Sequence, residues 1–234
     1  MSQIRFKLLS LKCSIDNIEE LKSVLTNNFY EELLGSGFVD VYIEDNELKG
    51  SYAETKTITR VVTDPFGISQ EFDFIDYSYV NFSIQKVGSG RYVLTILSPP
   101  QSVKSLIDKF SAIIPGGIVV LSKDLNLNKL YVLLLDTKEL SSLRVDRLRV
   151  GNFSISDTAK ASMEIVSRKS AFDEIESVVR NRAFTVDKIK GRGLCRESSF
   201  TFELVKTGLG SVTEEVFPLI KTLIIKNLED IQIS

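Results

Sequence analysis

The chain has 234 residues, of which 43% are hydrophobic and 26% are charged, and it contains two cysteines and no histidine. This composition is typical of a globular protein built as one large domain or two small ones. Histidine is the usual general base near neutral pH and the commonest metal ligand. Its absence excludes Ser-His-Asp and Cys-His catalysis and HExxH zinc sites, but leaves carboxylate-bound magnesium and Lys or Tyr as a base.

The sequence also bears on the compartment. No apolar run approaches the roughly 18 residues that a membrane helix needs, and residues 1–17 lack the pattern of a signal peptide. Cys13 and Cys195 are too far apart in the sequence to indicate a zinc site or a disulfide framework. We therefore expect a cytoplasmic protein without membrane association.

The net charge of −2 hides an uneven distribution. Residues 144–197 carry 12 Lys and Arg against 8 Asp and Glu, which gives +4. Residues 1–143 carry 14 against 18, which gives −4, and residues 198–234 carry 3 against 5, which gives −2. Such an asymmetry favours an anionic partner for the positive segment.

The N-terminal residues predict a strand followed by a helix. Residues 4–8 alternate apolar and basic side chains, which is the period of a strand. Residues 15–25 then place apolar side chains on one helical face, with Asp16 as a start signal. The helix can continue to Leu34, where Gly35 would end it.

Strands and one clear helix follow. Residues 38–98 contain alternating and aromatic-rich runs that predict antiparallel strands, with a hairpin turn at 88–90. Residues 101–114 predict a helix, because apolar residues recur at i, i+3, i+4 and i+7. The unbroken apolar runs at 118–122 and 129–136 predict two strands that are buried on both faces.

A similar order of elements begins again after residue 143. Residues 158–166 alternate like a strand, and residues 170–182 predict a helix. Two more strands are predicted at 183–190 and 199–206, with a basic, glycine-containing connection between them.

The last elements complete the predicted fold. Ser211 begins a capping box for a helix that Pro218 should kink or shorten, and residues 231–234 predict a closing strand. Both halves then show the βαββαβ order of a ferredoxin-like unit. The sequence therefore predicts an α+β fold with two ferredoxin-like halves in tandem: residues 1–143, with additional antiparallel strands, and residues 144–234.

Basic residues gather near the end of the positive segment. They are Arg180, Arg182, Lys188, Lys190, Arg192 and Arg196. The first two end the predicted helix, and the others lie in or beside the loop between the second and third strands of the second half. Arg and Lys suit phosphate contacts, and the glycines at 191 and 193 allow close approach. The alternative is a solvated hairpin whose charges maintain solubility.

Aromatic residues offer a second candidate surface. Phe200 and Phe202 have the spacing of an RNA-recognition strand, but they form the more apolar face of their strand and are predicted to be core. Tyr77 and Tyr79 lie on a mixed polar face of a long strand. They are candidates for stacking on a base or contacting a protein partner, or they belong to an ordinary half-exposed strand.

The remaining motifs predict no cofactor and no metal site. No glycine-rich segment has the strand–loop–helix context of a nucleotide site, and Asp73 and Asp76 point to opposite faces of their strand. The preferred hypothesis is a non-catalytic nucleic-acid-binding subunit that contacts the phosphate backbone of RNA or DNA through the basic loop and helix end. The alternatives are a protein–protein adaptor or assembly subunit, with a protein partner or as a homo-oligomer, and a carboxylate-metal phosphoesterase.

Overall fold

The computed structural model describes residues 2–121, 124–154, 158–179 and 184–230, which form eleven β-strands and five α-helices. The chain divides into two compact units. The split unit consists of Met1–Leu9 and Ser122–Ser234, and the continuous unit is Ser10–Leu121. Within the described residues, no helix has the length and apolar character needed to cross a membrane.

The continuous unit contains two helices and most of its strands in one antiparallel series. Its elements are α1 (Ile18–Thr26), β2 (Ser36–Glu44), β3 (Glu47–Thr63), β4 (Ser69–Gly88), β5 (Arg91–Leu97), α2 (Lys104–Ile113) and β6 (Ile118–Leu121). The strand order is β2-β3-β4-β5, followed by the last part of β1 (Gln3–Cys13), which pairs with β6. The predicted hairpin at 88–90 and the predicted helix at 101–114 are confirmed.

Aromatic side chains form the core of the continuous unit. The ring of Phe38 contacts those of Tyr52, Phe82 and Phe110, and Phe82 also contacts Phe110. The ring centroids of these pairs are 5.3–5.9 Å apart. Leu21 and Leu25 of α1 are also buried. Burial of these apolar side chains is the main source of stability for such a unit. 

The first helix is shorter than its longest prediction and is capped differently. The side chain of Asn17 caps α1 by accepting from the backbone N–H of Glu19, and the helix ends at Thr26. Asp16 lies outside the helix, where it accepts from the backbone N–H of Gly90 and pairs with Lys86. These contacts keep the pKa of the Asp16 carboxyl below its ordinary value.

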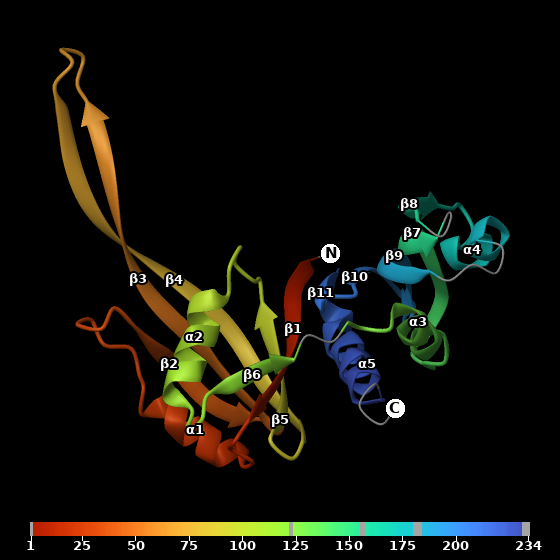
Figure 1. Ribbon diagram of the computed structural model, residues 1–234, viewed down its shortest axis with the longest axis horizontal. Coiled ribbons are helices and arrows are strands. Elements are labelled where there is room, and N and C mark those ends of the chain that lie inside the picture. Colours follow the sequence, from red (N-terminus) through yellow and green to blue (C-terminus); the bar gives the residue numbers. More distant parts are fainter. Residues whose placement is uncertain (1, 122–123, 155–157, 180–183, 231–234) are drawn as a thin grey trace. The chain divides into compact units, whose positions relative to one another are not determined.

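Strands β3 and β4 extend far beyond their neighbours. Strand β2 pairs with β3 only up to Glu54, and β5 pairs with β4 only from Asn81. Between them, residues 56–76 form a two-stranded ribbon in which every residue is exposed, and we call this ribbon the β3–β4 arm (Figure 1). At its tip the carboxylate of Asp64 accepts from two backbone N–H groups of the turn.

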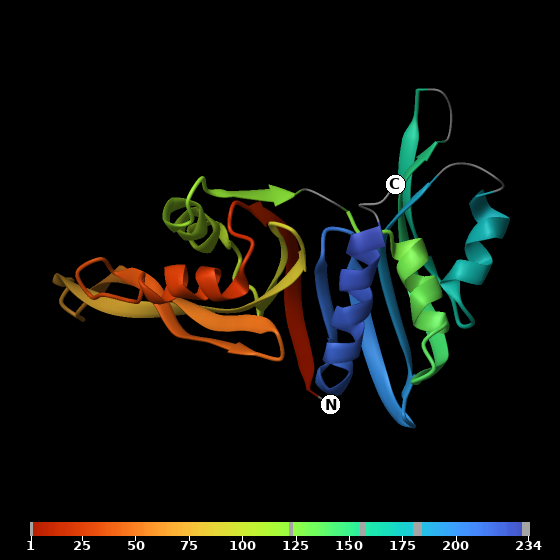
Figure 2. The ribbon, with the colours of Figure 1, turned by 90° about the horizontal axis from the view of Figure 1, so that it is seen from below.

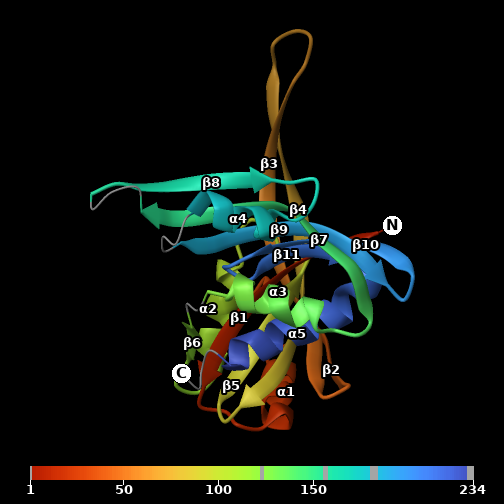
Figure 3. The ribbon, with the colours of Figure 1, turned by 90° about the vertical axis from the view of Figure 1, so that its right-hand side faces the viewer.

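The split unit carries its helices on one face of an antiparallel sheet (Figure 2). Its further elements are α3 (Leu127–Leu135), β7 (Leu140–Ser154), β8 (Lys160–Val166), α4 (Ala171–Val179), β9 (Thr185–Cys195), β10 (Ser198–Val205), β11 (Leu209–Thr213), the 3-10 turn η1 (Glu214–Val216) and α5 (Phe217–Asp230). The strand order is β1-β11-β10-β9-β7-β8. Helices α3 and α5 lie side by side, and α3 also contacts β7 and β9 (Figure 3).

The predicted tandem of two ferredoxin-like halves is wrong. After α4 the chain forms three strands in succession, β9, β10 and β11, each paired antiparallel with the next. Strand β7 pairs with β9 on the far side of this meander, and β1 extends the sheet beyond β11. Short hairpins pair neighbouring strands directly, whereas a ferredoxin-like unit needs a helix between its third and fourth strands. Strand β7 also contains the predicted boundary at residues 143 and 144.

Two local predictions, a strand at 129–136 and a helix start at Ser211, are wrong. Residues 129–136, predicted as a strand, lie largely in α3, because Leu127, Leu130 and Leu134 are buried at helical spacing and Asn126 caps the first turn. Ser211 lies in strand β11 and starts no helix. Helix α5 begins at Phe217, so Pro218 occupies its first turn, where a missing N–H costs little. The strand predicted at 231–234 lies outside the described residues.

Candidate nucleic-acid interface

The segment predicted as a basic loop is strand β9. Lys188, Lys190 and Arg192 alternate along it and point to the sheet face opposite the helices, where all three are partly or fully exposed. The predicted loop is reduced to a turn at Arg196 and Glu197, which both have positive φ, of 48° and 74°. A two-residue turn of this type suits the twist of a hairpin.

The two glycines of β9 serve packing on the helix-covered face. A Cβ on Gly191 would meet the carbonyl oxygen of Arg144 and lie 2.7 Å from the ring of Phe202. A Cβ on Gly193 would lie 2.9 Å from the ring of Phe200. Both phenylalanines are buried, as predicted from their alternation. The glycines therefore make room for phenylalanine rings, and this packing accounts for them without a phosphate loop.

Strand β7 brings a second row of cations next to the first. Arg144 lies opposite Arg192, Arg147 opposite Lys190 and Arg149 opposite Lys188. Directly opposed residues of antiparallel strands point to the same face. Val145, Leu148 and Val150 alternate with these arginines and are buried beneath the sheet.

Strand β1 adds cations across the sheet. Arg5 lies opposite Ser211, Ser211 opposite Glu203, and Glu203 opposite Lys190, so all four share one face. Lys7, two residues after Arg5, points to the same side. We call this surface the basic face, and it carries the cations Arg5, Lys7, Arg144, Arg147, Arg149, Lys160, Lys188, Lys190 and Arg192.

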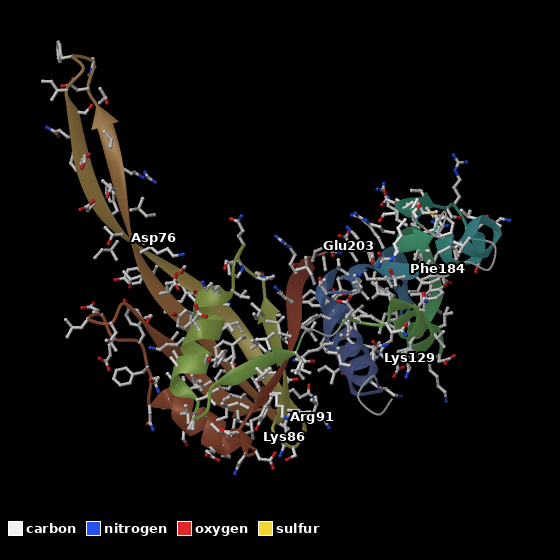
Figure 4. The ribbon with its side chains drawn as sticks, in the orientation of Figure 1. Asp76, Lys86, Arg91, Lys129, Phe184 and Glu203 are labelled. Atoms are coloured by element: carbon white, nitrogen blue, oxygen red, sulfur yellow. The ribbon has the colours of Figure 1, made fainter. Side chains whose placement is uncertain are left out.

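Three acids lie among these nine cations: Asp146, Glu164 and Glu203. Glu203 of β10 (labelled in Figure 4) binds Lys188 at 2.6 Å and Lys190 at 3.6 Å. The hydrogen bond from Lys188 keeps the pKa of Glu203 below its ordinary value, so this carboxylate is charged at neutral pH. The described part of the basic face thus retains an excess of six positive charges.

A depression of about 560 Å³ lies where β7, β9 and the end of β8 meet. Its charged lining residues are Arg144, Asp146, Arg147, Arg168, Lys190 and Arg192. Asp146 lies at a bulge in β7 and accepts from Nε of Arg144 at 2.7 Å and pairs with Nε of Arg192 at 3.1 Å. Arg144 also donates from Nη1 to the carbonyl oxygen of Arg168. Asp146 therefore holds two guanidinium groups in place without neutralising the site.

The structure separates Arg196 from this surface. Arg196 lies in the turn after β9. Together with Glu139 and Glu215, it lines a second depression, separate from the one around Asp146. Arg180 and Arg182 lie outside the described residues. Sequence reasoning missed Arg144, Arg147, Arg149, Arg5 and Lys7 as members of the site. Their alternation with apolar residues marks exposed strand faces, but only strand pairing shows that these faces adjoin β9.

Tyr77 and Tyr79 lie in β4 at the base of the β3–β4 arm. Both are exposed and point to the same side of the strand. The ring of Tyr30 contacts that of Tyr77 at 6.3 Å between centroids, and this neighbour raises the pKa of Tyr77 above its ordinary value. Within the arm, two basic and four acidic side chains give a net charge of −2. A polyanion is therefore poorly matched to this part of the chain.

The described residues contain no group of three or more Asp, Glu, Cys or His side chains that could hold a metal ion. No protein-family model matches the sequence, and comparison with curated proteins gives no match either. The site itself is therefore the basis for a functional assignment.

Proposed function

We propose that the protein is a non-catalytic nucleic-acid-binding subunit that contacts the phosphate backbone of RNA or DNA through the basic face. The observation that carries this proposal is the pairing of β7 with β9, which sets three arginines opposite three further cations on one exposed sheet face. Regularly spaced cations on a rigid surface suit a regularly charged polymer. The rungs of this array lie roughly 6.6 Å apart, two residues along a strand.

The same surface favours backbone contacts over base recognition. No aromatic side chain lies among the described residues of the basic face, and the nearby Phe200 and Phe202 are buried on the other side of the sheet. Binding through stacked bases therefore has no platform here. We expect weak sequence selectivity and strong dependence on salt, because released counterions supply most of the binding free energy.

A charge-reversal experiment tests the proposal. Anisotropy of a fluorescent mixed-sequence oligonucleotide would compare the wild type with Lys190→Glu/Arg192→Glu, and with Arg196→Glu as a control from the same hairpin. The double variant should lose binding, whereas the control should retain it, because Arg196 lies off the basic face. Unchanged affinity in the double variant would refute the proposal. Nucleic acid copurifying with the wild type, seen as a raised 260/280 nm absorbance ratio, would support it.

A second candidate function, an assembly subunit, rests on the β3–β4 arm. An isolated two-stranded ribbon is marginally stable in water and gains from cover. The arm exposes the apolar side chains of Ile58, Phe72 and Phe74 on one face, among the charged side chains of Lys56, Arg60 and Asp76. The arm and its neighbouring side chains are drawn in Figure 4, with Asp76 labelled near the base.

This arm face is complementary to itself. Lys56 lies opposite Asp76, Ile58 opposite Phe74, and Arg60 opposite Phe72. Two copies related by a two-fold axis along the arm would lay β3 of one over β4 of the other. Lys56 would then meet Asp76, Arg60 would meet Phe72, and Ile58 would meet Phe74. Arg60 already lies over the ring of Phe74 at 5.8 Å. The occupant that this pattern fits is a second copy of the chain.

Light scattering with size exclusion tests the arm dimer. The wild type should be dimeric at micromolar concentrations, and Asp76→Lys should make it monomeric by opposing like charges. The swap Lys56→Asp/Asp76→Lys should restore the dimer. A wild type that stays monomeric, or a swap that fails to restore association, would reject this candidate.

For both functions we propose a cytoplasmic setting, where the two free thiols of Cys13 and Cys195 stay reduced.

A further inference from the structure

The depression beside Asp146 concentrates more positive charge than a row of backbone contacts needs. Five cations and one acid line it, which leaves an excess of four positive charges around one small space. Arg147 and Arg168 form no salt bridge with a described residue, so their guanidinium groups are available to a ligand. An internal phosphodiester carries one negative charge, whereas a phosphomonoester carries about 1.5 to 2 at neutral pH.

The arginines around this space are held in position before any ligand arrives. The carboxylate of Asp146 pairs with Nε of Arg144 at 2.7 Å and with Nε of Arg192 at 3.1 Å. Arg144 also donates a hydrogen bond from Nη1 to the backbone carbonyl of Arg168 at 2.8 Å. Side-chain entropy is therefore already lost in the free protein. The outer N–H groups of such guanidiniums match the oxygens of a phosphate in pairs.

We propose that this depression binds the terminal phosphomonoester of a nucleic-acid strand, while the cations farther along β7 and β9 hold the phosphodiesters that follow. This inference rests on the proposed nucleic-acid binding. Arg149 and Lys188 lie roughly 13 Å along the strands from Arg144 and Arg192, at about 3.3 Å per residue. A strand that starts in the depression can therefore continue along the basic face.

The test compares the ends of otherwise identical oligonucleotides. One set carries a 5′-phosphate, one a 3′-phosphate and one only hydroxyl ends, and affinity is measured by anisotropy in competition. We expect about tenfold tighter binding for one phosphorylated end, as for one added charge-assisted contact. The end that gains affinity identifies which terminus enters the depression. Equal affinity for all three would overturn end recognition and leave backbone binding intact, whereas no binding by any would overturn both.

A point substitution separates the two sites. Arg168 lies at the edge of the depression but outside the basic face. Arg168→Gln should abolish the preference for a phosphorylated end and leave the affinity for the hydroxyl-ended strand unchanged. Lys169→Gln, which removes an exposed neighbouring cation outside the depression, should keep the preference. If Arg168→Gln and Lys169→Gln behaved alike, the depression would not be the end-binding site.

Discussion

Neutralising Arg147 and Lys190 together should change the salt dependence of binding in a calculable way. The basic face has nine cations and an excess of six positive charges. With about 0.9 per phosphate contacted on B-DNA, the slope of log affinity against log salt should lie between about −5.4 and −8. Removing two contacts by Arg147→Gln/Lys190→Gln should reduce that slope by about 1.8. Over a fourfold rise in salt, the wild type should therefore lose roughly tenfold more affinity than the variant.

The control for this experiment removes the same two residue types elsewhere. Arg196 lies in the β9–β10 turn, and Lys226 is exposed on α5, which packs on the other face of the sheet. Arg196→Gln/Lys226→Gln should leave the slope at the wild-type value, although it changes the net charge equally. Anisotropy titrations at several salt concentrations give both slopes. Equal slopes in the two double variants would show that overall charge, and no particular surface, governs binding.

Three further predictions concern Glu203, Gly191 and Tyr92. Glu203→Gln should raise the affinity for oligonucleotides, because Lys188 and Lys190 lose their acidic partner. Anisotropy should show this difference from the wild type disappearing as the pH falls through the lowered pKa of Glu203, because the wild-type carboxyl then becomes neutral as well. The ion pairs of Glu203 should stabilise the fold fully above the ordinary pKa of a glutamate. This stabilisation should be lost as the pH falls through the lowered pKa of Glu203, which urea denaturation at several pH values can measure. Gly191→Ala should lower the free energy of unfolding by about 1–3 kcal/mol, because its Cβ meets the backbone of β7 and the ring of Phe202; an unchanged urea midpoint would contradict that packing. Tyr92→Phe should lower the free energy of unfolding by about 1 kcal/mol, since the buried hydroxyl donates to the carbonyl of Ile15 at 3.0 Å. Burial raises the pKa of Tyr92 to about 12, so the midpoint of its ionisation, followed by absorbance in the folded protein, should lie near that pH.

Local patterns predict many elements of this chain correctly. Alternation identifies β8, β9 and β10, and it places Phe200 and Phe202 in the core. Helical spacing identifies α2. The apolar run of α3 misleads because every residue from Leu130 to Leu135 is apolar, which hides the helical period, and the cap at Asn126 decides the structure.

Strand pairing accounts for what local patterns miss. The glycines of β9 suggest a loop, and only their contacts with Phe200 and Phe202 explain them as strand residues. The composition of residues 144–197 points to the positive region, but β8 and α4 separate the arginines of β7 from their partners in β9. Non-local pairing of this kind depends on the whole sheet, so the site emerges only with the tertiary fold.

Lysine footprinting tests the location of the nucleic-acid site most directly. The protein is acylated with and without a saturating mixed-sequence oligonucleotide, and modification at each lysine is quantified by mass spectrometry. Lys7, Lys188 and Lys190 should become protected, whereas Lys138 and the helix-side Lys226, both exposed, should react equally in the two samples. Protection of Lys138 or Lys226, with Lys188 and Lys190 unchanged, would contradict the assignment of the basic face as the binding surface.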